Sequence, residues 1–221
     1  MAAIPGPSAP ADVLGASIVM LGVFDPLLLQ PAYLGDTGLL SDGDLAELQY
    51  QFLSPDITVM SLKWMRAIVE PTKFTVSTTL ESPIIEPIRD FVFTLYDTLK
   101  LRHVTAVGYN YDTHFAVASE EEWHALGHRL APKDIWEGLI TRPGTASLTI
   151  RGQRTDELEG AVNVKIEPSG RVHPGIYINF NDHMALGKLD SDRLVAVAAE
   201  RFVASKQHSD EIVAAIKDIA R

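Results

Sequence analysis

The chain has 221 residues, of which 46% are hydrophobic and 22% charged, and its formal net charge is −10. These proportions are typical of a globular domain and exclude a disordered chain. The negative charge argues against a nucleic-acid partner, because such proteins usually present a basic surface to the phosphates. The absence of cysteine excludes disulfides, thiolate metal sites and cysteine nucleophiles, and it fits the reducing cytoplasm.

The N-terminal residues predict a disordered tail over residues 1–12, and residues 13–221 then form a single domain. The tail is rich in proline, glycine and alanine, which build no packed element. It has no basic region, so it is not a secretory signal. The longest apolar stretch, residues 18–29, is broken by a glycine, an aspartate and a proline. We therefore expect a cytoplasmic protein without a membrane segment.

The first half of the chain predicts strands and a helix, separated by turn residues. Residues 25–43 are punctuated by proline and glycine and predict an irregular excursion, followed by a short helix within residues 44–52. The expected strands cover residues 16–24, 57–62, 65–69 and 74–79. In the last of these, Phe74, Val76 and Thr78 share one face, which is the period of a half-buried antiparallel strand.

The pattern that follows residue 82 predicts the clearest helix of the chain, over residues 84–99. Ser82 and Pro83 are favoured at helix starts, and Pro87 moves the regular start towards Glu86. Its apolar residues recur at spacings of three and four and form one stripe. They are Ile84, Ile88, Phe91, Val92, Leu95, Tyr96 and Leu99.

The second half predicts four more strands and two helices. The strands cover residues 104–111, 147–151, 161–166 and 175–180. A helix over residues 119–130 begins with a capping box, in which Ser119 is followed three residues later by Glu122. A C-terminal helix runs from residue 189, with an interruption expected at His208 and Ser209. Because strands and helices come in groups, we expect an α+β fold, with amphipathic helices packed on a mostly antiparallel sheet. The sequence shows no internal repeat.

Two polar clusters are the candidate site. Asn110, Asp112 and His114 alternate along one predicted strand, and Asn179, Asn181 and His183 alternate along another. If the two rows meet, Asp112, His114 and His183 form a candidate catalytic or metal site, because carboxylate and imidazole bind divalent metals. The alternative is that both clusters lie on the solvated face of a sheet, which needs polar residues at every second position.

Other sequence patterns give weaker indications of a functional site. No phosphate-binding glycine loop, nucleophile elbow or zinc-protease motif is present. No sequence motif indicates which cofactor, if any, the protein binds. His124 and His128 are four residues apart on a predicted helix, but no third ligand is specified nearby. Ser169 and Ser191 have no histidine and acid at a recognisable spacing. Nucleic-acid binding requires that folding gather scattered basic residues, namely Arg102, Arg151, Arg154 and Arg171.

The block from Phe74 through the 84–99 helix to the Val107-Gly-Tyr-Asn-Tyr111 strand resembles a known group. It is similar to the sporadically distributed bacterial protein families of unknown function, which also show a strand, an amphipathic helix and a Gly-centred aromatic strand. The resemblance covers less than a fifth of the chain. It departs at Val107-Gly108-Tyr109, where the group favours Leu-Arg-Tyr. The resemblance implies a bacterial accessory protein and no particular activity, cofactor or catalytic residue.

These observations predict a non-enzymatic binding or assembly protein of a bacterial accessory system. We expect it to be oligomeric through an exposed sheet edge or helix face, with itself or another protein as partner. The alternative is a small-molecule or metal-dependent enzyme that uses Asp112, His114 and His183. Converging His and Asp side chains in a deep pocket would favour the enzyme, and a flat apolar face would favour the assembly protein.

Overall fold

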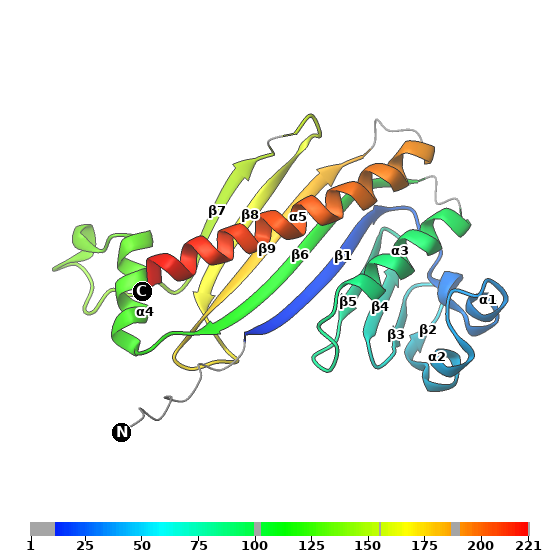
Figure 1. The fold of residues 1–221 in the computed structure, drawn as a ribbon, viewed down its shortest axis with the longest axis horizontal. Coiled ribbons are helices and arrows are strands. Elements are labelled where there is room, and N and C mark those ends of the chain that lie inside the picture. Colours follow the sequence, from blue (N-terminus) through cyan, green and yellow to red (C-terminus); the bar gives the residue numbers. More distant parts are fainter. Residues whose placement is uncertain (1–11, 100–102, 155, 187–190, 221) are drawn as a thin grey trace, which may run out of the picture.

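The computed structural model describes residues 12–99, 103–154, 156–186 and 191–220. Within them the fold is α+β, as predicted: nine strands form one antiparallel sheet in the order β2-β3-β4-β5-β1-β6-β9-β8-β7 (Figure 1). The strands are β1 (Val13–Gly22), β2 (Gln49–Leu53), β3 (Thr58–Ser61), β4 (Met65–Glu70), β5 (Lys73–Thr78), β6 (Val104–Ala116), β7 (Leu148–Gln153), β8 (Gly160–Pro168) and β9 (Gly175–Ala185).

Five α-helices and two short 3₁₀ helices complete the described fold. They are η1 (Pro26–Leu29), α1 (Pro31–Asp36), α2 (Asp42–Glu47), α3 (Glu86–Leu99), α4 (Glu120–Leu130), η2 (Asp134–Trp136) and α5 (Ser191–Ala220). Among the described residues, no helix is both long and apolar enough to cross a membrane.

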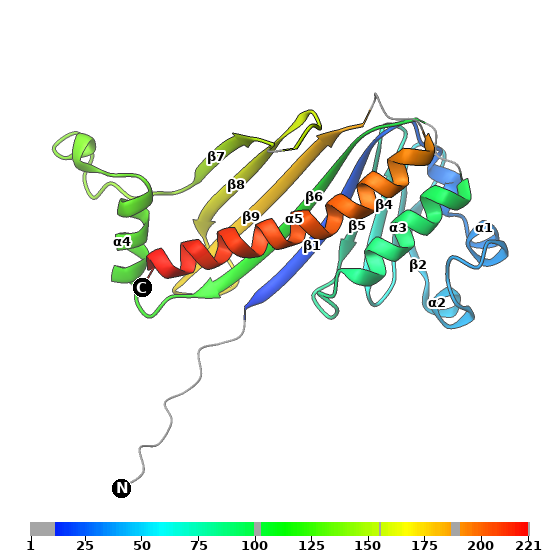
Figure 2. The same cartoon turned by 45° about the horizontal axis from the view of Figure 1, so that its top comes forward.

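Helices α3 and α5 lie on the same face of the sheet (Figures 1 and 2). The main core lies between them and the strands and includes Ile18, Val76, Tyr109, Leu95 and Phe202, all at most 3% exposed. A second cluster gathers where the end of α5 meets α4 and the β6–β9 pair, and it includes Leu126, Ile178 and Ile216. Helix α5 contributes residues to both clusters, so it packs against the sheet along much of its length.

The chain repeats one topology twice, although its sequence shows no repeat. In each half a long strand is followed by a helical excursion, and then by a meander of strands. The last strand of the meander returns to pair with the long one, and a helix ends the half. The long strands of the two halves, β1 and β6, pair antiparallel at the centre of the sheet, with Ile18 opposite Tyr109. The inner edge strand of each half is therefore paired with the other half. The outer edge strands of the sheet are β2 in the first half and β7 in the second.

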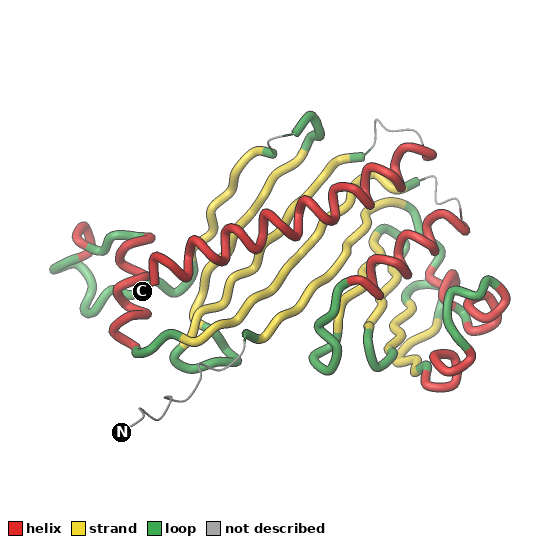
Figure 3. Tube along the Cα trace, viewed as in Figure 1, coloured by secondary structure: helices red, strands yellow, loops and turns green. Residues whose placement is uncertain are grey.

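Three local expectations need correction. The helix expected within residues 44–52 is α2, which ends at Glu47, and Gln49–Leu53 is strand β2. The earlier start follows from a capping box between Ser41 and Asp44. The residues that follow α2 pair with β3. The excursion over residues 25–43 also contains η1 and α1, as Figure 3 shows.

Helix α5 is continuous through His208 and Ser209, where an interruption was expected. Both residues turn towards the sheet: Ser209 is buried, and the His208 ring makes an edge contact with Phe180. Two other predictions are confirmed: α3 begins at Glu86, and Ser119 caps α4. The predicted tail lies outside the described residues except for Asp12, whose carboxylate pairs with Lys217 of α5.

Candidate functional site

The face of the sheet opposite α3 and α5 carries the polar residues singled out in the sequence, and we call it the open face. In β9, buried residues alternate with half-buried polar ones. The register of β6 and β9 sets Asn110 opposite Asn181 and Asp112 opposite Asn179. The two predicted clusters therefore lie on adjacent strands, and Tyr177 of β9 shares their face. Their members on the open face are Asn110, Asp112, His114, Asn179, Asn181 and His183.

A chain of side-chain hydrogen bonds crosses four strands of the open face. The Asn163 amide donates to the Asn181 Oδ1 at 3.0 Å, and the Asn181 amide donates to the Asn110 Oδ1 at 2.8 Å. The Asn110 amide in turn donates to the Ser17 Oγ at 3.2 Å. These residues are directly opposite one another in register. The amides therefore use their donors and acceptors on each other and stabilise the register of the sheet.

The Asp112 carboxylate is held by two neutral donors. Its Oδ1 accepts from the Tyr177 hydroxyl at 2.6 Å and from the Asn179 amide at 2.9 Å. Burial raises the pKa of the Tyr177 phenol, and the hydrogen bond to Asp112 raises this pKa further. Tyr177 therefore remains a donor at neutral pH, and one oxygen of the carboxylate is already bound.

His114 is buried between a tyrosine ring and a turn. Its ring stacks on Tyr177 with centroids 4.6 Å apart, and its Nδ1 lies 2.9 Å from the Ser169 Oγ. The Ser169 Oγ accepts from the backbone N–H groups of Arg171 and Val172. Because these bonds occupy the oxygen lone pairs, the hydroxyl hydrogen is directed to His114, which accepts it at Nδ1. Burial first, and then the charge of Arg171, lowers the pKa of His114.

Sequence reasoning did not find this Ser169–His114 contact, because 55 residues separate the two positions. A serine hydroxyl bound to a histidine nitrogen is one element of an activated nucleophile. Here, however, the Ser169 oxygen already accepts two backbone N–H groups in a tight turn. Its lone pairs are committed to the turn, which favours a structural role over attack on a substrate.

His183 is not brought to the other two candidate ligands. It lies opposite Gly108 and Ala161, whereas His114 lies opposite Tyr177. His183 and Tyr177 are six residues apart on β9, so about 20 Å separates His183 from His114 at the usual rise of a strand. Among the described residues, no group of three or more His, Asp or Glu side chains is placed to hold a metal ion.

The histidine pair on α4 lies beside a separate cavity. His124 and His128 line a pocket of about 520 Å³ between α4, the segment after it and the ends of β7 and β8. Both imidazoles are exposed, and His128 lies 3.9 Å from the Asp134 carboxylate. The floor of the pocket is apolar and includes Leu126 and Ile176.

A buried charge cluster lies on the helix-covered face. The Arg154 guanidinium forms ion pairs with Asp156 and with Asp182 of β9, and Arg201 of α5 lies 3.4 Å from Asp156. Arg154 and Asp182 are 7% and 6% exposed at their side chains. Hydrogen bonds from Arg154 lower the pKa of Asp156. The cluster borders a pocket of about 340 Å³, and it ties the β7–β8 hairpin to α5.

The described basic residues that a nucleic-acid surface would need lie on different parts of the fold. Arg154 is paired on the helix-covered face, whereas Arg151 lies opposite Asn163 on the open face. Arg171 lies in the turn between β8 and β9, and Arg102 lies outside the described residues. No alternation or motif signals the buried ion cluster, since its charged residues come from three distant segments.

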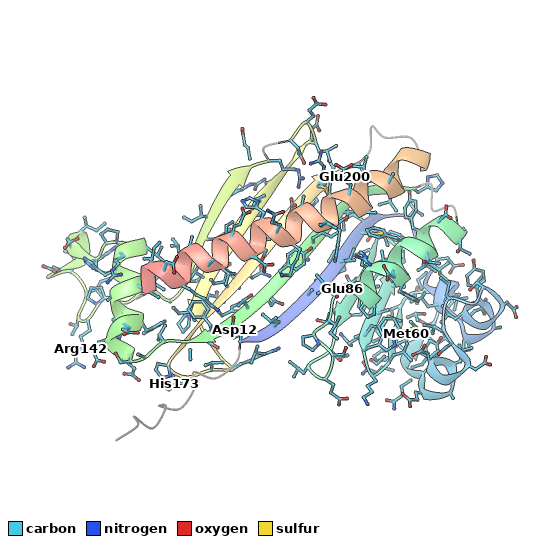
Figure 4. The ribbon with its side chains drawn as sticks, in the orientation of Figure 1. Asp12, Met60, Glu86, Arg142, His173 and Glu200 are labelled. Carbon is cyan, nitrogen blue, oxygen red and sulfur yellow. The ribbon has the colours of Figure 1, made fainter. Side chains whose placement is uncertain are left out.

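Along the described chain, large exposed apolar side chains are most closely spaced in the segment after α4, which leads into strand β7. We call this surface the apolar end; it consists of Ile135, Trp136, Leu139, Ile140 and strand β7. The exposed fractions of Ile135 and Leu139 are 75% and 74%, and that of Ile150 in β7 is 56%. The segment after α4 extends beyond the sheet (Figure 1), and Figure 4 shows Arg142 of the same segment at this end.

The two outer strands of the sheet differ in regularity. Strand β2 has a register shift between Tyr50 and Phe52, and such irregularities protect an edge from further pairing. Strand β7 pairs with β8 without a shift from Leu148 to Gln153, and it contains one charged residue and no proline. Strand β7 is therefore a regular edge that can accept another strand.

Two comparisons with known proteins found no match to this chain. No protein-family model matches the chain, and no curated protein matches it.

Proposed function

We propose that this chain is a non-enzymatic binding or assembly protein that contacts a protein partner through the apolar end. The observation that carries the proposal is that five large apolar side chains between residues 135 and 150 are exposed, the last of them, Ile150, in a regular edge strand. Contiguous exposed apolar surface usually marks an interaction site. Burial of one such side chain on a partner contributes roughly 1.5–3 kcal/mol. The assignment to a bacterial accessory system rests on the family resemblance alone.

The open face gives weaker support to the enzyme alternative. One observation favours it: the Ser169 hydroxyl contacts the His114 Nδ1. The surrounding groups argue for a structural role, because Asp112 Oδ1 and the Ser169 oxygen are bound by neighbours, and His183 lies far along β9. The candidate residues thus stabilise strands and a turn.

Photo-crosslinking in the cells that naturally carry the gene tests the proposal. A photoreactive amino acid is placed at Leu139 in one variant and at Leu80 in a control. Leu80 is 70% exposed, close to the 74% of Leu139, but lies outside the apolar end. We expect a crosslinked product heavier than 24.2 kDa from position 139 and none from position 80. Equal yields from both positions, or none from 139, would refute a dedicated contact surface there.

A further inference from the structure

We infer that the partner at the apolar end is a second copy of this chain, joined through β7. In the proposed pair, the β7 strands of the two copies lie antiparallel across a two-fold axis that passes Ile150. The two nine-stranded sheets then form one continuous sheet. This inference rests on the proposed function and specifies its partner and geometry.

The faces of β7 restrict the axis to positions at a residue. Ile150 lies opposite Val164, which lies opposite the buried Phe180, so Ile150 belongs to the helix-covered face. Arg151 lies opposite Asn163 and belongs to the open face. A two-fold axis perpendicular to the sheet keeps each face on its own side. An axis between two residues would pair Ile150 with Arg151 and mix the faces.

Of the central positions, Ile150 gives the complementary register. With the axis at Ile150, the two exposed isoleucines are opposite each other, and Arg151 is opposite Thr149 of the partner copy. Leu148 is then opposite Gly152, which has no side chain, and even a Cβ built on Gly152 would meet nothing within 4 Å in the single chain. With the axis at Arg151, two arginines of like charge are opposite each other, which destabilises a sheet. The Ile150 register thus covers the apolar side chain and separates the charges.

The absence of cysteine makes this register directly testable. Residues directly opposite in antiparallel strands have Cα atoms about 4.5–5.5 Å apart, and disulfides span about 4.4–6.8 Å. We therefore expect Ile150→Cys to form a disulfide-linked dimer under mild oxidation, at twice the 24.2 kDa mass of the chain. Arg151→Cys and Gly152→Cys are matched controls on the same strand, and we expect both to remain single chains.

A second variant keeps the inference testable without oxidation. Ile150→Glu sets two like charges at the axis and removes the apolar contact, so the dissociation constant measured by sedimentation should rise at least about tenfold. Val203→Glu on α5 is the control, because Val203 is 60% exposed and lies outside the apolar end. Far-ultraviolet circular dichroism of each variant verifies the fold.

The outcomes separate this inference from the proposed function. Dimers that link only through position 150 support it. A dimeric wild type that links through Arg151→Cys, or through neither position, refutes the register. A wild type of single-chain mass at all concentrations refutes the second copy as partner; the proposed function then survives if Leu139 still crosslinks to a product of another mass.

Discussion

At the scale of single residues, the candidate side chains of the open face form contacts that join different segments of the fold. His114 stacks on Tyr177 and accepts the hydroxyl of Ser169, while Tyr177 also donates to Asp112. Each contact joins two segments, namely β6 with β9, or β6 with the turn that follows β8. Because most of the polar atoms are committed to neighbours, the group has little capacity left for a ligand.

Burial of His114 predicts that the fold is sensitive to acid. Its pKa is lowered from 6.5 in the folded protein, chiefly by burial. The unfolded chain therefore binds a proton at a higher pH than the folded one, and stability is lost as pH falls from about 6.5 through the folded pKa. We expect the free energy of unfolding to decrease between pH 7 and pH 5. It should decrease less steeply in His114→Gln, measured by urea unfolding, and parallel curves would contradict this role.

Metal content tests the enzyme alternative. We expect protein purified without chelator to contain no stoichiometric zinc or manganese in elemental analysis, because Asp112 and His114 are engaged by neighbours and His183 lies apart. The double variant His114→Ala, His183→Ala should give the same metal content as the wild type. One equivalent of metal in the wild type that disappears in the double variant would instead establish the metal-dependent enzyme.

At the scale of elements, α3 is the helix whose sequence pattern was most informative. Its inward residues Ile88, Val92 and Leu95 are fully buried, and the helix packs against β1 and β5. Ile84 belongs to the same apolar pattern but precedes the helix and is 58% exposed. The periodicity identified the buried face of α3. Ile84 remains outside the core because the helix begins two residues after it.

A matched pair of substitutions tests this face. Leu95→Asp should lower the free energy of unfolding by roughly 3–5 kcal/mol, because it removes a core side chain and buries an unpaired charge. Ile84→Asp makes the same chemical change at an exposed position, and its effect should stay within about 0.5 kcal/mol. Denaturant midpoints of the two variants provide the measurement. A small effect at Leu95 would contradict the assigned core.

At the scale of the whole molecule, two features hold the second half together. Helix α5 is about 45 Å long at 1.5 Å per residue, and it contributes Phe202 to one core cluster and Ile216 to the other. Beneath it, the ion cluster joins Arg154 of the β7–β8 hairpin to Asp182 of β9 and, through Asp156, to Arg201. The hairpin that carries the proposed contact edge is thus attached to the body of the molecule.

Removal of one partner from the ion cluster should destabilise the protein. Asp182→Ala leaves Arg154 buried with one carboxylate fewer, so we expect a loss of roughly 2–4 kcal/mol in thermal or urea unfolding. The exposed pair of Glu70 and Lys73 is the control, and Glu70→Ala should cost less than about 1 kcal/mol. Combining Arg154→Met with Asp182→Leu should recover part of the loss, because no unpaired charge remains. Equal effects of Asp182→Ala and Glu70→Ala would contradict the structural role.

The sequence by itself determined the fold class, the strands that alternate, helix α3 and the Ser119 cap of α4. These features depend on neighbours within a few residues, so local periodicity and capping residues reveal them. It also placed Asn110, Asp112 and His114 on one strand face, because alternation along a strand is local.

Tertiary structure decided what those residues contact. Which strands pair, and in which register, depends on contacts between distant segments; register set Asp112 opposite Asn179 and His183 far from His114. The same holds for the contact of Ser169 with His114, for the buried Arg154 cluster, and for β7 as the outer strand. Periodicity shows that a residue faces one side of its strand. Only the packing of the whole chain decides whether that side meets a neighbour, a core or solvent.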